Sequence, residues 1–81
     1  MTSEEAKIGE WYHVLLPSGS YYVKYSGENR CSEFINPDGD IDKNGGYVGN
    51  NINYTYCSPS TMHQLFQQYF KSEINNTYIH P

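Results

Sequence analysis

Residues 10–26 read EWYHVLLPSGSYYVKYS, and this stretch decides the fold class that the sequence predicts. Two runs rich in aromatic and aliphatic residues, 10–16 and 21–26, flank a Pro-Ser-Gly-Ser segment, which is typical of a β-hairpin with a four-residue loop. Side chains alternate between the two faces of a strand, so one face of this hairpin is predicted to be buried. That face consists of Tyr12, Val14, Leu16, Tyr21, Val23 and Tyr25.

The opposite face of the hairpin is mixed. Its polar part, with Tyr22, Lys24 and Ser26, is predicted to point outward. Trp11 and Leu15 on the same face need a cover, because an exposed apolar patch of this kind marks a contact surface. The cover comes either from a later element of the chain or from a second copy, so a homo-oligomer is one alternative.

Shorter β segments follow the hairpin. CSEFIN (31–36) predicts a third strand, YVGN (47–50) a fourth, and NINYTYC (51–57) a fifth with Ile52, Tyr54 and Tyr56 on one face. Residues 27–30 form a predicted turn, and the turn residues of 37–46 predict a loop or a short-stranded hairpin. Residues 10–57 are thus predicted to be a β meander after a loose N-terminal lead, 1–8.

The periodicity changes at Ser58. A Ser N-cap at 58 or 60 and a Pro in the first turn predict a helix over 58–74, followed by a tail over 75–81. Its apolar stripe has helical spacing and needs a partner surface, for which the uncovered face of the hairpin is available. The stripe consists of Met62, Leu65, Phe66, Tyr69 and Phe70.

These elements predict an α+β, mainly β fold in one domain, 1–81: a small bent antiparallel sheet or partly open five-stranded barrel with one C-terminal amphipathic helix. The succession of GEWY, YYVKYSG and a strand leading into SPSTMHQLF resembles small bacteriophage and bacterial proteins with a barrel of the Src-homology-three type plus one helix. Those proteins often carry an acid in the first helical turn, where this chain has Ser60, Thr61 and Met62. The resemblance implies the fold and a viral origin.

Composition limits the classes of partner. The formal charge is −4, and the five basic residues are scattered, which argues against binding to a nucleic acid backbone. No run of 18 apolar residues occurs, so we expect a cytoplasmic protein with no membrane segment and with Cys31 and Cys57 as free thiols. Acidic residues concentrate in the middle of the chain and predict an acidic edge. They are Glu28, Glu33, Asp38, Asp40 and Asp42.

Tyrosine is unusually frequent, with nine residues in 81. A domain of this size cannot bury nine phenols, because each buried hydroxyl needs a hydrogen-bond partner. Several rings are therefore expected at the surface. Exposed tyrosines beside Ser, Gly and Asn favour protein recognition, and their alternative role is simply to occupy the outer face of a sheet.

Residues 40–51, DIDKNGGYVGNN, match the start of a calcium-binding loop of the EF-hand type. Asp40, Asp42, Asn44 and Gly45 occupy its first, third, fifth and sixth positions. The twelfth position, which requires a bidentate acid, is Asn51, and the flanking segments are strand-like rather than helical. A structural turn is therefore the preferred interpretation, and no metal site is predicted.

The sequence predicts no catalytic site and no cofactor. Cys57 and His63 could form a nucleophile–base pair across the junction of strand and helix. A buried thiol and a surface imidazole explain the same residues without chemistry. The five Cys and His residues also lack the local spacing of a zinc site.

We therefore predict a non-enzymatic cytoplasmic protein-binding module whose partner is another cytoplasmic protein with a basic or mixed surface. If the resemblance to phage proteins is followed, it implies an inhibitor of a host enzyme or defence system. The predicted partner-binding residues are Tyr22, Tyr47, Asp38, Asp40 and Asp42. The alternative is a small-ligand module that binds a nucleotide or other anion. Its predicted ligand-binding residues are Tyr22, Lys24 and Arg30.

Overall fold

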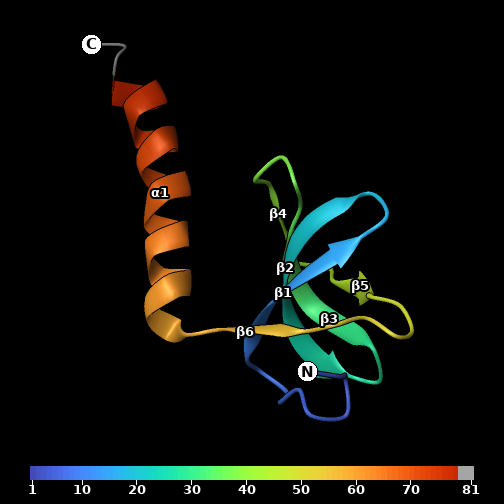
Figure 1. Cartoon of the computed structure of the whole chain (residues 1–81). Helices are drawn as coiled ribbons and strands as arrows, with labels where there is room; N and C mark the ends of the chain where they lie inside the picture. Colours follow the sequence, from blue (N-terminus) through green and yellow to red (C-terminus); the bar gives the residue numbers. More distant parts are fainter. Residues whose placement is uncertain (79–81) are drawn as a thin grey trace.

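The computed structural model describes residues 1–78, with side chains described for residues 1–68. In this part of the chain, six antiparallel strands form one sheet and a single helix follows them (Figure 1). The sheet order is β4-β3-β2-β1-β6 with β5 also paired to β3, and the sheet is not closed. The predicted α+β, mainly β class is confirmed. The elements are β1 Trp11–Leu16, β2 Gly19–Gly27, β3 Arg30–Ile35, β4 Ile41–Asp42, β5 Gly46–Tyr47, β6 Thr55–Cys57 and α1 Pro59–Tyr78.

The β1–β2 hairpin is tighter than predicted. Leu16 pairs with Gly19, so the connection is Pro17-Ser18 rather than the four residues 17–20. Gly19 has a φ of 139°, and a Cβ at this position would lie 2.7 Å from the Pro37 side chain. Only glycine tolerates both the backbone conformation and the close neighbour, which allows the second strand to begin earlier than its aromatic run.

The predicted buried face of this hairpin is confirmed for four of its six residues, and the other two, Leu16 and Tyr21, are partly buried beside them. Tyr22, which the sequence predicts to point outward, instead packs against buried residues on the other face. Tyr12, Val14, Val23 and Tyr25 are all at most 5% exposed and form the main core. Tyr54 joins them at 0% exposure, and its ring packs edge-on against Tyr12 and Tyr25 with centroid distances of 5.7 Å and 5.4 Å. We call Tyr12, Tyr25 and Tyr54 the core tyrosines.

The last predicted strand is much shorter than 51–57. Asn51 has a φ of 57°, and only Thr55–Cys57 pairs with β1. The backbone N–H of Tyr54 instead donates to the carbonyl of Met1 at 2.7 Å, so the N-terminal segment replaces a strand partner there. Tyr56 packs against Tyr12 as the face assignment predicts, yet it is 47% exposed because β6 lies at an edge of the sheet.

Segment 37–48 turns back along β3. β4 pairs with the end of β3 through Ile35 and Ile41, and β5 pairs with its start through Cys31 and Gly46. The sequence predicts a loop or a short-stranded hairpin within 37–46, but the two short strands pair with β3 rather than with each other. The predicted strand 47–50 is reduced to Gly46–Tyr47. Between the two short strands, Gly45 lies so close to β3 that a Cβ would overlap the Cys31 carbonyl.

Helix α1 begins where the sequence predicts. The Ser58 hydroxyl accepts a hydrogen bond from the Thr61 N–H at 3.2 Å, which is the N-cap arrangement. The helix continues through residues 75–77 to Tyr78, beyond the predicted end at Ile74. Asn and Thr reduce helix stability only modestly, and no Gly or Pro interrupts the segment before Pro81. The predicted tail is therefore helical over 75–78, and 79–81 lie outside the described residues.

The first turns of α1 cover the second face of the sheet. Ile35, Cys57 and Met62 form a separate buried cluster there, at 0%, 7% and 3% exposure. The Trp11 ring contacts Phe66 edge-on at a centroid distance of 5.5 Å, so the helix supplies the cover that Trp11 requires. Leu15, on the same face, stays 71% exposed. No described helix is long and apolar enough to cross a membrane.

Candidate binding surfaces

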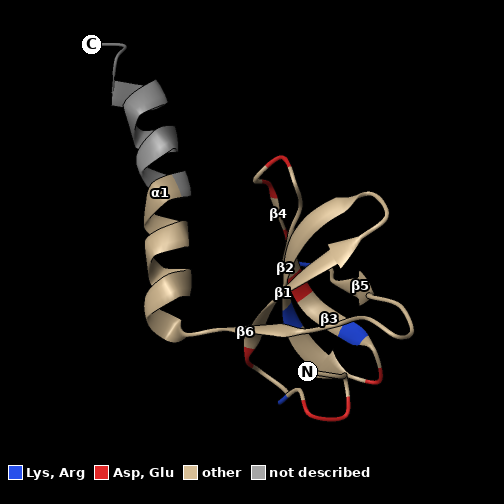
Figure 2. Ribbon diagram, in the orientation of Figure 1, with Lys and Arg blue, Asp and Glu red and all other residues tan. Residues whose placement is uncertain are grey.

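Three predicted site residues lie in the β3–β4 hairpin: Asp38 and Asp40 in its turn and Asp42 in β4. Figure 2 shows the acidic residues of this hairpin in red. The Asn36 side-chain oxygen accepts hydrogen bonds from the backbone N–H groups of Asp38 and Asp40, each at 3.0 Å. Asp42 accepts from the Asn44 N–H at 2.8 Å. These contacts are the Asx turns that Asn and Asp commonly form, and they hold the hairpin with its carboxylates at the surface. We call Asp38, Asp40 and Asp42 the aspartate hairpin.

The predicted acidic edge is narrower than five residues. Glu33 forms an ion pair with Lys24 at 3.6 Å, which offsets its charge. Glu28 lies in the turn between β2 and β3, at the opposite end of these strands from the aspartate hairpin. The acidic charge near β4 is therefore that of the three aspartates, with Lys43 next to Asp42 in the sequence. None of the three forms an ion pair with a described residue.

The loop that resembles a calcium site is organised as turns. Asp42 uses a carboxylate oxygen to hold the Asn44 N–H, and Asn51 lies in a separate segment beside the N-terminus. Within residues 1–68, whose side chains are described, no group of three His, Cys, Asp or Glu residues is placed to hold a metal ion. The contact between Asp42 and the Asn44 N–H is that of a turn, as the preferred interpretation expects.

An open hollow of about 270 Å³ lies between the β1–β2 hairpin and the β3–β5 pair. We call it the β3–β5 groove. Its rings, the groove rings, are Tyr21, Phe34 and Tyr47. The rest of its lining consists of Leu16, Cys31, Gly45, Gly46 and Val48.

The groove rings are held in place. The Tyr21 ring packs edge-on against Phe34 at 6.0 Å, and the Tyr21 hydroxyl lies 2.8 Å from that of Ser18. The Tyr47 hydroxyl donates to the Asn50 side-chain oxygen at 2.7 Å, although Tyr47 is 57% exposed. An exposed ring that is already fixed loses little conformational entropy when a partner binds.

Strand register places acidic charge beside this groove. Asp42 is directly opposite Phe34 in the β3–β4 pair, so both side chains lie on the same side of the sheet. Burial raises the pKa of the Cys31 thiol, which lines the groove, and the nearby Asp42 carboxylate raises it further. Pro37, in the aspartate hairpin's turn, adjoins Gly19 in the β1–β2 connection, close to Leu16 at the groove.

Tyr22 lies apart from the other predicted partner-binding residues. It stands opposite Ile35 on the face covered by α1 and packs beside the second buried cluster. Its ring is tilted against His13 at a centroid distance of 5.0 Å. The structure therefore brings Tyr47 and Asp42 to one surface and Tyr22 to another, because the helix forms a second layer over the face that alternation alone marks as outward.

The residues of the alternative anion site are also separated. Lys24 is paired with Glu33, and Arg30 lies near the far end of β3, opposite Tyr47. Tyr22 lies toward the other end of the strand, opposite Ile35. None of the three side chains lines the hollows of about 440, 240, 320 and 270 Å³.

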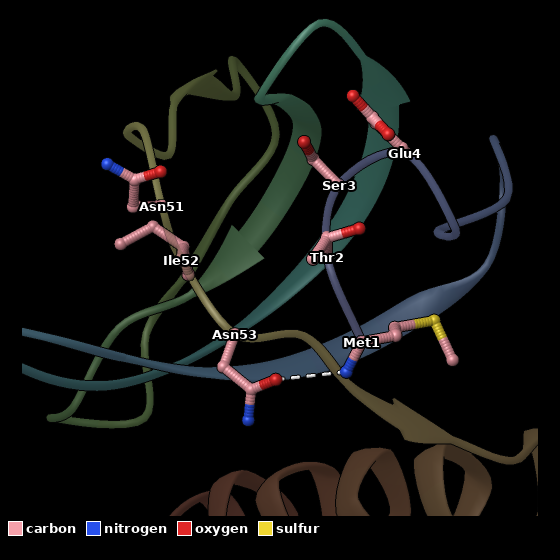
Figure 3. A pocket seen from close by; sticks show the side chains of 7 residues that line it. All are labelled: Met1, Thr2, Ser3, Glu4, Asn51, Ile52 and Asn53. Atoms are coloured by element: carbon pink, nitrogen blue, oxygen red, sulfur yellow. Dashed lines mark hydrogen bonds between the residues drawn. The ribbon is translucent and has the colours of Figure 1, made fainter.

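A hollow of about 440 Å³ lies between residues 1–4 and residues 51–53 (Figure 3). The amino group of Met1 donates to the Asn53 side chain at 2.9 Å and to the Tyr54 carbonyl at 2.8 Å, which joins the two segments. The lining contains no aromatic ring, and Glu4 is its one ionisable side chain. These contacts explain how the segment is anchored and indicate no particular ligand.

Cys57 and His63 share a hollow of about 320 Å³ at the start of α1, beside Glu10. The thiol is buried and donates to the Thr55 carbonyl at 3.7 Å, and burial raises its pKa. A cysteine nucleophile requires the opposite shift, toward the thiolate at neutral pH. The geometry therefore favours a packing role for this thiol.

Sequence reasoning missed most of the groove. Alternation assigns Leu16 and Tyr21 to the buried face of the hairpin, and Phe34 and Val48 receive no role beyond their predicted strands. The groove forms because β5 returns to pair with β3, and a two-residue strand has no periodicity that could predict its partner. The adjacent glycines 45 and 46 beside Tyr47 were the available signal, since small residues next to a ring leave that ring uncovered.

Comparisons with other proteins gave no match. No protein-family model matches the chain, and no curated protein or solved structure matches it significantly.

Proposed function

We propose that this chain is a non-enzymatic binding module that attaches to another protein through the β3–β5 groove and the adjoining aspartate hairpin. The observation that carries the proposal is the pairing of Asp42 with Phe34, which places a carboxylate next to fixed aromatic rings on an open surface. Rings that provide contact area, with acids at the rim, are suited to a partner whose surface is basic or mixed.

The size of the groove supports a protein partner over a free nucleotide. Sites for whole small molecules usually enclose about 300–1,000 Å³, and the groove lies just below that range. Phosphate groups would also meet the aspartates without a clustered base to offset them. The groove is better suited to one side chain of a larger partner, while the hairpin contacts the surface around it.

The resemblance to small phage proteins favours a finer version of the proposal. A domain of this kind can block a surface of a host enzyme or defence protein without any chemistry of its own. The inhibitor role then requires only that the bound face of the target be needed for the target's activity.

Affinity capture from a lysate of the native host, with three matched baits, tests the proposal. The first bait is the wild-type chain, the second carries Asp38→Asn, Asp40→Asn and Asp42→Asn, and the third carries Glu4→Gln, Glu5→Gln and Glu28→Gln. The two variants change the net charge equally, but only the second alters the hairpin. We expect one protein to be retained by the wild type and the third bait and lost from the second.

Measurement with the purified partner then completes the test. The aspartate variant should weaken binding about tenfold or more and reduce its dependence on salt, since rim charges act mainly through screened electrostatics. Equal retention by all three baits would overturn the proposed surface. If nothing is retained, the protein-binding function is rejected, and a thermal-shift panel of nucleotides tests the small-ligand alternative.

A further inference from the structure

The chemistry of the β3–β5 groove selects a cation. Three of its lining residues are aromatic, and aromatic faces attract positive groups electrostatically. The Asp42 carboxylate has one oxygen engaged with the Asn44 N–H and forms no ion pair with any described residue. Asp42 does not line the groove, but it lies opposite the lining residue Phe34, and its charge acts on the Cys31 thiol, which also lines the groove. An apolar side chain in the groove would leave this carboxylate without a counter-charge. A cation supplies one.

The groove also has a wall without side chains. Gly46 pairs with Cys31, which lines the groove, so a Cβ at position 46 would be on the groove side. No atom lies within 4 Å of that Cβ position, and the φ of Gly46 is not in the left-handed region. The backbone of Gly46 therefore does not require glycine, and the missing side chain leaves space beside Tyr47.

We infer that the groove receives an arginine side chain of the bound protein, with its guanidinium among the groove rings and within reach of Asp42. This inference rests on the proposed function and names the group recognised. Guanidinium is preferred to ammonium because it is planar, stacks on aromatic rings, is weakly hydrated and can donate two hydrogen bonds to one carboxylate. The free volume of about 270 Å³ suits one such side chain.

The test is an NMR titration of the full-length, isotopically labelled protein with three short capped peptides. Acetyl-Gly-Arg-Gly-amide carries the cation, the citrulline peptide has nearly the same shape without charge, and the lysine peptide carries an ammonium. We expect saturable shifts at the amides of Phe34, Gly46 and Tyr47 with the arginine peptide. The citrulline peptide should bind at least about tenfold more weakly.

Four variants locate the binding. Gly46→Val fills the open wall with a residue that strands favour and should reduce affinity about tenfold or more. Asp42→Asn should reduce it about threefold to tenfold. Glu4→Gln makes the same charge change at a different hollow and should leave it unchanged. Tyr47→Ala removes an exposed ring of the groove. It provides a second way to weaken binding at the groove if Gly46→Val does not fold.

Several results would overturn the inference. Two of them concern the shifts: shifts spread over the other acidic residues, or no shift at the groove at tens of millimolar peptide. The other two concern affinity: equal binding of the arginine and citrulline peptides, or full affinity for the arginine peptide in both Gly46→Val and Tyr47→Ala. Tighter binding of the lysine peptide would overturn the choice of guanidinium. If the capture experiment yields a partner whose binding depends on the aspartates while the peptides do not bind, the inference about arginine is rejected and the proposed function is supported. If the peptide binds the groove and capture yields nothing, the proposed function falls instead.

Discussion

The core tyrosines and the groove rings are two sets of three aromatic residues with opposite fates. The core tyrosines are at most 5% exposed and pack edge-on against one another, whereas the groove rings line an open hollow. The core set is covered because Tyr54 enters from an irregular segment and the N-terminal residues bond to it and to Tyr12. The groove set stays open because its neighbours are Gly45 and Gly46.

This difference shows that exposure here is determined by the covering segments rather than by the rings themselves. Both sets use the same residue types in or beside the same sheet. Tyr21 and Phe34 also pack against the main core, whereas Tyr47 is 57% exposed. Substitution of Tyr47 should therefore leave stability nearly unchanged and affect binding instead. The predictions below test that separation.

The largest expected effect is the loss of a core ring. Tyr12→Ala removes a ring that contacts Tyr25, Tyr54 and Tyr56, and it should lower the free energy of unfolding by about 3–5 kcal/mol. Tyr47→Ala, in the groove, should lower it by less than about 1 kcal/mol. Urea denaturation of both variants provides the comparison. Similar losses would mean that the two sets are not energetically distinct.

The hairpin and the start of the helix illustrate what can be predicted from this sequence. Alternation over six or more residues assigns Val14 and Val23 to the core correctly, and the Ser58 cap marks the beginning of α1. These are local signals with a clear period. The faces of β1 and β2 needed no knowledge of the rest of the chain.

The errors lie where a distant contact decides the local structure. The two-residue connection between β1 and β2 depends on the close approach of Gly19 to the Pro37 side chain. The short β6 depends on the hydrogen bond from the Tyr54 N–H to the Met1 carbonyl. The surface that combines Tyr47 with Asp42 requires the two short strands on β3. None of these pairings leaves a periodic trace in the sequence, so the acidic and aromatic residues could be recognised but not assembled into one site.

The second prediction concerns alkaline pH. Burial raises the pKa of Tyr54 to about 12, and the nearby Tyr25 and Cys31 add to the effect. In the unfolded chain the pKa of this phenol has its ordinary value, about 10. Between pH 10 and 12 the phenol is therefore ionised in the unfolded chain and still neutral in the folded one. The contribution of this group to stability is therefore fully present below pH 10 and is lost as pH rises toward 12, by about 2–3 kcal/mol.

Tyr54→Phe isolates that contribution from the other tyrosines and the lysines. The difference in unfolding free energy between wild type and variant, measured by denaturation from pH 8 to pH 11.5, should change in favour of the variant above pH 10. A difference that stays constant with pH would show that the Tyr54 phenol ionises normally in the folded protein.

The third prediction separates two hydroxyls inside the core set. The Tyr12 hydroxyl accepts a hydrogen bond from the Lys7 N–H at 2.8 Å, whereas the Tyr54 hydroxyl has no partner among the described residues. At pH 7, Tyr12→Phe should cost about 1 kcal/mol, because it leaves the Lys7 N–H without its acceptor. Tyr54→Phe should be neutral or stabilise the fold by up to about 1 kcal/mol, because it removes a buried hydroxyl that gains nothing.

Denaturation of the two single variants under identical conditions measures the sign of each change in unfolding free energy. The ring packing is preserved in each case, so cavity formation does not enter the comparison. A loss in both variants would indicate that the Tyr54 hydroxyl is hydrogen-bonded in solution, for example to a buried water.

The smallest expected change in stability is at Gly46, and it bears directly on the groove rings. Gly46→Ala should change the unfolding free energy by no more than about 0.5–1 kcal/mol, in the stabilising direction, since it restricts the unfolded chain without a clash in the folded one. The adjacent Gly45→Ala is the contrasting variant, because its φ is 70° and its Cβ would overlap the Cys31 carbonyl. Thermal unfolding should rank Gly46→Ala at or above wild type and Gly45→Ala well below it. If Gly46→Ala also weakens binding of the arginine peptide, glycine at position 46 contributes to recognition and not to stability. The groove rings would then differ from the core tyrosines in function as well as in exposure.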